Sequence, residues 1–161
     1  MSSDHLTRRL VICGLLGLAG CGFAPVYDGG RTIRGQFAFE TDESVIGFQT
    51  RTRLAERLGE TTAPRYVIKV ATTTSERAAA ITAEGDTARL NIIGVAQWSV
   101  VETGTGVQIE TGQTEAFTSY AATGSTVATQ ATRDDARQRL AIILADMIVT
   151  RVLAGLGGQP E

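Results

Sequence analysis

Hydrophobic and polar residues alternate over residues 33–40, which is the periodicity of a half-buried β-strand. Over residues 45–58 the apolar spacing changes to three and four, which is typical of an amphipathic helix. Asp42 or Ser44 can cap its start, and Gly59 is a natural C-terminal stop. The spacing predicts that the inward face of this helix consists of Val45, Phe48, Thr52, Ala55 and Leu58.

Three later segments have the composition of strands. Residues 65–74 and 88–101 are rich in β-branched residues, and the weakly patterned stretch between them, 75–87, is expected to be a loop or a ragged hairpin connection. The turn sequence at 103–106 predicts a hairpin between the 88–101 strand and a strand that follows the turn. Gly112 in that last strand is a candidate bulge.

Residues 126–153 contain neither proline nor glycine and predict a long helix. Its broad apolar face, expected to lie on the sheet, consists of Leu140, Ile143, Leu144, Met147, Ile148 and Val152. Ile142, Val149 and Leu153 project from nearly the opposite side. They are either scattered surface aliphatics, which are common, or residues that face a partner, and we take them as partner-facing candidates.

The element order is therefore β-α-β-β-β-α. The simplest architecture is an α+β two-layer sandwich, in which two helices pack on one face of a mainly antiparallel four-stranded sheet. The other face of the sheet is then left for solvent, a ligand or a partner.

The N-terminus has the pattern of a secretory signal. Two arginines precede an uncharged run, residues 10–20, that is too short to span a membrane. The run ends in Leu-Ala-Gly-Cys at 18–21, which resembles the lipobox of bacterial lipoproteins and implies lipidation of Cys21. We expect a signal peptide at 1–20, a lipidated tether at 21–32, a single α+β domain at 33–155 and a flexible tail at 156–161.

This processing removes most catalytic chemistry from the mature chain. Cys13 and His5, the only histidine, leave with the signal peptide, and Cys21 is consumed by lipid. The remainder contains no cysteine–histidine dyad, serine–histidine–aspartate triad or usual zinc ligand set. We expect no catalytic residue, no metal and no cofactor, although the sequence leaves open a pair of carboxylates.

The net charge of the mature chain argues against nucleic acid as a partner. The full chain has 15 basic and 17 acidic side chains, and the signal peptide contains Asp4, Arg8 and Arg9. Its removal leaves 13 basic and 16 acidic side chains, a net charge near −3. Nucleic-acid binding depends on neutralising phosphates with basic side chains. A chain with this charge matches such a ligand poorly.

The chain resembles the LptE family of lipopolysaccharide (LPS)-assembly lipoproteins, in its alphaproteobacterial branch. The most specific similarity is at residues 21–27 and 120–148, and the shared architecture covers essentially the whole mature chain. The resemblance implies a non-enzymatic lipoprotein anchored on the periplasmic side of the outer membrane. It also implies partnership with LPS and with an LptD-type β-barrel translocon, which such a protein plugs and helps to assemble for delivery of LPS to the surface. Gly22, which follows Cys21 in place of an aspartate, is consistent with outer-membrane sorting.

Candidate LPS contacts are Lys69, Arg77 and Arg89, which flank the connection between two sheet strands. Their cationic groups could meet LPS phosphates through charge-assisted hydrogen bonds, or they could be ordinary solvated charges. Two other functions remain open on the residues alone. One is a generic envelope lipoprotein with a different partner, and the other is a lipid-anchored hydrolase that uses carboxylates.

Overall fold

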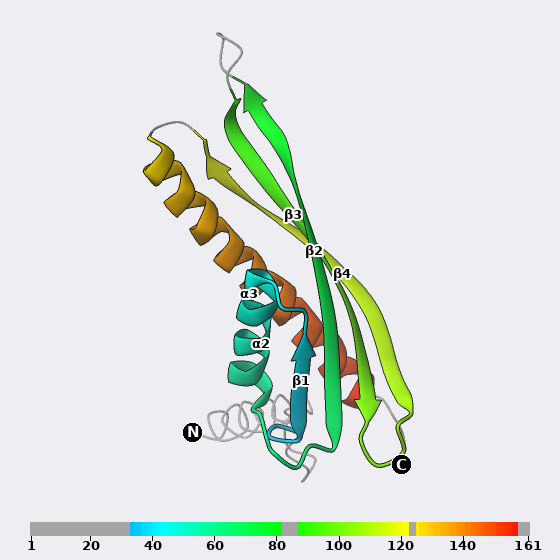
Figure 1. Ribbon diagram of the computed structural model, residues 1–161. Coiled ribbons are helices and arrows are strands. Elements are labelled where there is room, and N and C mark those ends of the chain that lie inside the picture. Colours follow the sequence, from blue (N-terminus) through cyan, green and yellow to red (C-terminus); the bar gives the residue numbers. More distant parts are fainter. Residues whose placement is uncertain (1–32, 82–86, 123–124, 158–161) are drawn as a thin grey trace, which may run out of the picture. The chain divides into compact units, whose positions relative to one another are not determined.

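The computed structural model describes residues 33–81, 87–122 and 125–157 (Figure 1). The expected signal peptide, Cys21 and the tether lie outside the described residues. The elements in chain order are β1 (Phe37–Thr41), α2 (Val45–Leu58), β2 (Tyr66–Ile81), β3 (Thr87–Glu102), β4 (Gln108–Ala121) and α3 (Thr126–Gly157).

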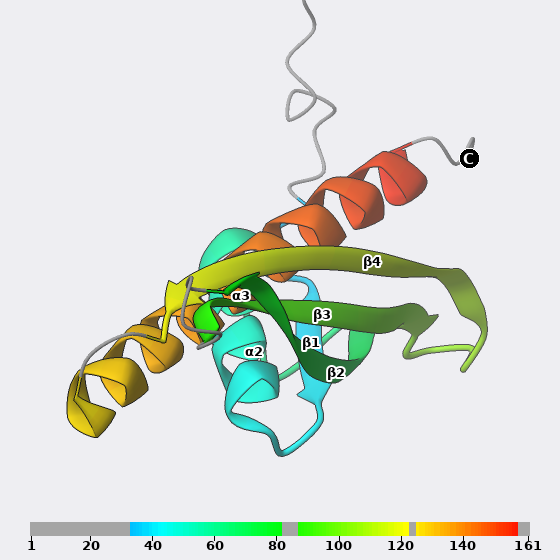
Figure 2. The same cartoon turned by 90° about the horizontal axis from the view of Figure 1, so that it is seen from above.

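The strands form one sheet in the order β1-β2-β3-β4. β1 runs parallel to β2, whereas the β2–β3 and β3–β4 pairs are antiparallel. Both helices lie on the same face of this sheet (Figures 1 and 2). The predicted α+β two-layer sandwich is therefore confirmed, including its mainly antiparallel sheet.

The core lies between the sheet and the helices. Even-numbered residues point toward the helices in β2 up to Ala78, in β3, and in β4 from Glu110 onward, because side chains alternate between the two faces of a strand between its irregularities. The largest fully buried side chains come from both layers and are Phe37, Leu54, Leu58, Ile68, Ile92, Val100, Leu140, Leu144, Ile148, Val149 and Val152.

The buried face of α2 differs from the predicted one. Phe48 is 65% exposed and Val45 is similarly exposed, whereas the row at a spacing of four, Ile46, Thr50, Leu54 and Leu58, is buried. The helix start explains this rotation. The Asp42 carboxylate accepts hydrogen bonds from the backbone N–H and the hydroxyl of Thr72, each at 2.7 Å, which fixes Asp42 against β2. A Cβ on Gly47 would collide with the backbone of Asp42. Gly47 must therefore face inward, which turns its neighbour Phe48 outward.

The last helix ends at Gly157, two residues past the expected domain boundary. Its buried residues form two rows, Ala136, Leu140, Leu144, Ile148 and Val152 in one and Ala141, Ala145 and Val149 in the other. Two rows are needed because α3 packs on both the sheet and α2. Its length and composition alone would also allow α3 to cross a membrane, but here it packs as a core helix.

The sheet corrects two further expectations. β2 continues to Ile81, so residues 75–81 form a strand rather than a loop. The irregularity in β4 falls at Ile109, because Val100 pairs with Glu110 and Val101 with Gln108. Gly112 pairs in register with Trp98 and is not a bulge.

Candidate interaction surface

Away from the irregularities near Ala80 and Gln108, the sheet face opposite the helices carries the odd-numbered residues of β2, β3 and β4, and no described element covers it (Figure 2). Its centre is apolar. Ile93 pairs with Phe117, which is 64% exposed, and both line a hollow of about 320 Å³ together with Asn91, Glu115 and Ala116. This hollow is the apolar part of a sheet face whose other residues are mainly polar.

Two of the three cationic candidates lie together at one end of this face. Arg77 pairs across the strands with Asn91, and Arg89 pairs with Ala121. Both side chains are exposed, and neither makes an ion pair with another residue that the structure describes. Each of these guanidinium groups therefore keeps its full set of donors for an anionic ligand.

Lys69 lies apart from these arginines. It is eight residues along β2 from Arg77, or about 26 Å in an extended strand. Its ammonium group forms an ion pair with Glu40 at 3.0 Å, at the edge of a shallow groove of about 500 Å³. Of the three predicted cations, Arg77 and Arg89 therefore lie together without ion pairs to described residues, whereas Lys69 lies apart and is paired with Glu40.

The partner-facing candidates on α3 are not equivalent. Ile142 is 37% exposed, and Leu153 is half-buried against the core. Val149 is only 2% exposed and belongs to the core, because α2 packs along that side of α3. The exposed Val45 and Phe48 on α2 are apolar surface residues that the sequence reasoning had placed inside.

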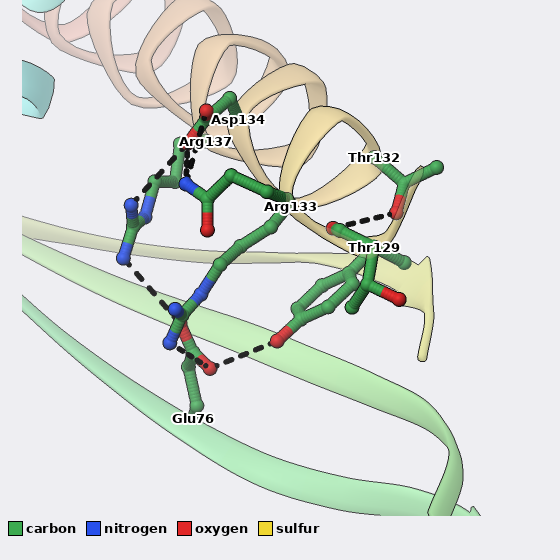
Figure 3. A network of polar contacts seen from close by, with 8 residues as sticks. Glu76, Thr129, Thr132, Arg133, Asp134 and Arg137 are labelled. Carbon is green, nitrogen blue, oxygen red and sulfur yellow. Dashed lines mark hydrogen bonds and ion pairs between the residues drawn. The ribbon is translucent and has the colours of Figure 1, made fainter. Parts of the chain in front are cut away.

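A polar network joins β2, β4 and α3 (Figure 3). The Arg133 guanidinium donates two hydrogen bonds to the Glu76 carboxylate, at 2.8 and 2.7 Å. The Tyr120 hydroxyl donates a third at 3.0 Å, and Arg137 lies 3.6 Å from the same carboxylate. Sequence reasoning missed this network. Its only local signal is a lone acid in the otherwise neutral run at 71–76, and its partners lie more than forty residues away.

The network shifts the proton affinities of its members. The Arg133 hydrogen bonds hold the pKa of Glu76 below its ordinary value, with Tyr120 and the Arg137 charge acting in the same direction. Burial, followed by the hydrogen bond to Glu76, raises the pKa of Tyr120. Glu76 is therefore held ionised, as a structural anchor between the two layers.

Among the residues that the structure describes, no group of three or more histidine, cysteine, aspartate or glutamate side chains could hold a metal ion. The arrangement that is present combines an apolar patch at Ile93 and Phe117 with two unpaired arginines at one end of the sheet face. It suits an amphiphile that presents both hydrocarbon and anionic groups. The fold that carries this arrangement belongs to the two-layer α+β class, with one face of the sheet left open.

Comparison with known proteins identifies the family. The family model for LptE, described as lipopolysaccharide-assembly, matches residues 32–152, and the chain belongs to that family. The family consists of outer-membrane lipoproteins of the Gram-negative envelope that take part in LPS assembly. The comparison with curated proteins gave no match.

Solved structures share the fold at low sequence identity. A lipoprotein from Caulobacter crescentus is similar with a TM-score of 0.63 and 20% identity, covering 79% of this chain and 95% of the other. The rare lipoprotein B of Shewanella oneidensis has a TM-score of 0.58 and 13% identity, covering 74% and 94%. A minor lipoprotein of Acinetobacter baumannii has a TM-score of 0.57 and 16% identity, covering 77% and 94%. At these identities the likeness shows the fold alone.

Proposed function

We propose that this protein is a lipid-anchored subunit of the outer-membrane LPS translocon. It binds and plugs the translocon's β-barrel, assists the assembly of that barrel and helps to deliver LPS to the cell surface. The match to the LptE family over residues 32–152 carries this proposal. The protein acts by binding rather than by catalysis, with Cys21 as its acylated attachment point on the periplasmic side.

The open sheet face is the proposed LPS contact. Its apolar centre at Ile93 and Phe117 can lie against acyl chains, and Arg77 and Arg89 can each donate hydrogen bonds to a phosphate. Lys69 is the weaker of the three cationic candidates, because Glu40 already neutralises it. The exposed apolar residues of the helix layer, Phe48 and Ile142, are the proposed contacts with the barrel, together with the half-buried Leu153.

Capture of the lipidated protein from gently solubilised outer membrane tests the barrel partnership. We expect a large β-barrel of the LPS translocon to co-purify, and depletion of the protein to leave that barrel misassembled. The matched control is Cys21→Ser, which keeps the folded domain but removes the acyl anchor and should reduce recovery of the complex. Recovery of the lipidated protein alone, or with only an inner-membrane transporter, contradicts the proposal.

Binding of fluorescent LPS tests the sheet face separately. Replacing both Arg77 and Arg89 by alanine should weaken binding by at least about tenfold, because the loss of even one charge-assisted hydrogen bond costs about 1.5–3 kcal/mol. Arg51→Ala/Arg57→Ala on α2 is the control, with the same charge change on exposed side chains of the other layer. Equal weakening by both double variants would show a general charge effect rather than a contact at this face.

A further inference from the structure

The two long edges of the sheet are protected very differently. At β4, the backbone carbonyls of odd-numbered residues point away from β3. Side chains of α3 cover three of them: Arg151 donates to Gln113 O, Arg139 to Ser119 O and Thr132 to Ala121 O, each at 3.2 Å. Two guanidinium groups thus lie across the path that an added strand would take. Side chains of α3 therefore cap the β4 edge at Gln113 and again at Ser119 and Ala121, which leaves only Glu115 and Phe117 between the capped positions.

At β2 the protection stops halfway along the strand. β1 pairs with Tyr66–Val70, and the Asp42 carboxylate then accepts the outward N–H of Thr72. In an antiparallel pair, residues alternate between bonding the neighbouring strand and pointing outward. The same parity therefore leaves the N–H and C=O groups of Thr74, Glu76 and Ala78 pointing outward. Among the described residues, none bonds these six groups.

The side chains along this open edge do not obstruct it. Residues 73–75 and 78–80 are threonine, serine and alanine, and no lysine or proline occurs between Thr72 and Ile81. The Glu76 charge is already neutralised from the helix side by Arg133 and Arg137. Soluble proteins normally guard such edges with lysine, proline or a covering element. At β4 two arginines of α3 cross the edge, whereas along β2 the two charged residues, Glu76 and Arg77, point to opposite faces of the sheet rather than across its edge, and pairing with β3 stays regular up to Ala78.

β1 demonstrates what this edge accepts. It pairs with β2 as a parallel strand and ends at Thr41, where the chain turns away at Asp42. A second extended segment placed in line beyond Asp42 would meet the free groups of Thr74, Glu76 and Ala78. Backbone pairing of this kind adds a strand to an existing sheet and places little demand on the sequence of the added segment.

We propose that the β2 edge from Thr74 to Ala78 is a strand-addition site, occupied by an extended segment of the β-barrel subunit. The choice of occupant rests on the proposed function, which places this domain against a partner built from extended strands. The β4 edge, which α3 caps, takes no partner strand. The sheet thus gains its fifth strand on one side only.

Hydrogen exchange of the complete lipoprotein, alone and in its purified complex with the barrel, tests the site directly. Within residues 73–79 the outward amides of Thr74, Glu76 and Ala78 should exchange at least tenfold more slowly in the complex. The neighbouring odd-numbered amides are already bonded to β3 and should change little, as should Glu115 and Phe117 on β4. A complex that forms without added protection at 73–79 overturns the inference and leaves the proposed function standing. If no complex forms, both fall, because the barrel is the named occupant.

Proline substitution provides an independent test. Ala78→Pro removes one outward N–H without removing a bond to β3, and proline is tolerated at such edge positions. We expect it to lower recovery of the barrel complex by about tenfold, with circular dichroism unchanged. Glu115→Pro removes an equivalent outward N–H from β4 and should leave recovery intact. Equal effects of the two variants overturn the assignment, as would an Ala78→Pro protein that is folded and fully active in complex formation.

A second copy of the chain is the competing occupant. Sedimentation of the detergent-solubilised lipoprotein should show one copy per particle at micromolar concentration. A dimer that Ala78→Pro dissociates and Glu115→Pro does not would assign the edge to self-association, and so overturn the barrel segment as its occupant.

Discussion

Gly112 determines how the widest side chain of the core fits against the sheet. Ring atoms of the Trp98 indole lie next to it, so a Cβ at position 112 would be 2.6 Å from Trp98 Cζ2 and 2.9 Å from Cε2. Trp98 is itself buried, and its ring cannot move away without displacing core neighbours. The requirement for glycine here comes from close approach rather than from an unusual backbone conformation.

We therefore expect Gly112→Ala to lower the free energy of unfolding by about 1–3 kcal/mol, as overpacked cores do. Gly104→Ala in the β3–β4 turn is the control, because a Cβ there meets no atom within 4 Å. Urea denaturation of both variants measures the difference. Equal stabilities for the two would show that Trp98 has room to move.

At the scale of elements, α3 is the part that holds the layers together. One buried row faces the sheet and the second is covered by α2, where Arg53 makes two hydrogen bonds to Asp146, both at 3.1 Å. Thr118 adds a bond from β4 to the Ala136 carbonyl at 2.8 Å. Small residues in the second row, Ala141 and Ala145, allow α2 to approach closely.

Two neighbouring residues of α3 make a matched test of this packing. Leu144 is fully buried, whereas Ile143 is 40% exposed although its sequence position suggested an inward side chain. Leu144→Ala should cost about 2–5 kcal/mol of unfolding free energy. Ile143→Ala should cost well under about 1 kcal/mol, as surface substitutions do. Thermal unfolding distinguishes them, and a larger loss for Ile143→Ala would contradict the orientation of the helix.

At the scale of the whole molecule, the Glu76 network fastens the sheet to the N-terminal half of α3, remote from α2 (Figures 1 and 3). The carboxylate lies on β2, and its partners come from β4 and α3. Because Arg133 and its neighbours lower the pKa of Glu76 in the folded state, the folded protein binds this proton less readily than the unfolded chain does. The stabilisation is therefore present above the unfolded pKa and is lost as the pH falls through the folded value.

Comparing Glu76→Gln with the parent across pH tests this linkage. At pH 7 the variant should be less stable by about 1 kcal/mol, a figure that allows for the partial exposure of the network. The difference should shrink as the pH drops below about 4.3, where an unperturbed glutamate becomes protonated. Glu115→Gln, an exposed acid without an ion pair among the described residues, should show no such trend. A gap between parent and Glu76→Gln that stays constant down to pH 3 would contradict the lowered pKa.

Local patterns predicted the identity and order of the elements because periodicities of 2 and 3.6 residues require only neighbouring positions. Every element from β1 to α3 was predicted in kind, and the β3–β4 hairpin was placed from its turn residues. The extension of β2 through residues 75–81 was missed because its alanines carry no strand signal. Its strand state depends on pairing with β3.

The candidate surface was predicted only in part. The sequence selected Arg77 and Arg89. Which alternate residues of each strand face away from the helices is decided by packing, and this determines the apolar neighbours of these two arginines. The misplaced Phe48 and Val149 have the same origin. A helix can present more than one apolar row, and which row is buried depends on the other elements that pack against it.

The sequence by itself determined the class of elements, their order, the family and the chemistry available to the mature chain. These follow from local periodicity, from short motifs and from a residue inventory that leaves no histidine or cysteine beyond the expected lipid anchor at Cys21. Only the tertiary structure decided the rotation of α2 and α3, the contacts that Glu76 makes, and the capping of one sheet edge by Arg139 and Arg151 while the other stays open. Each of these depends on groups that are distant in sequence and are brought together only by burial of a shared core.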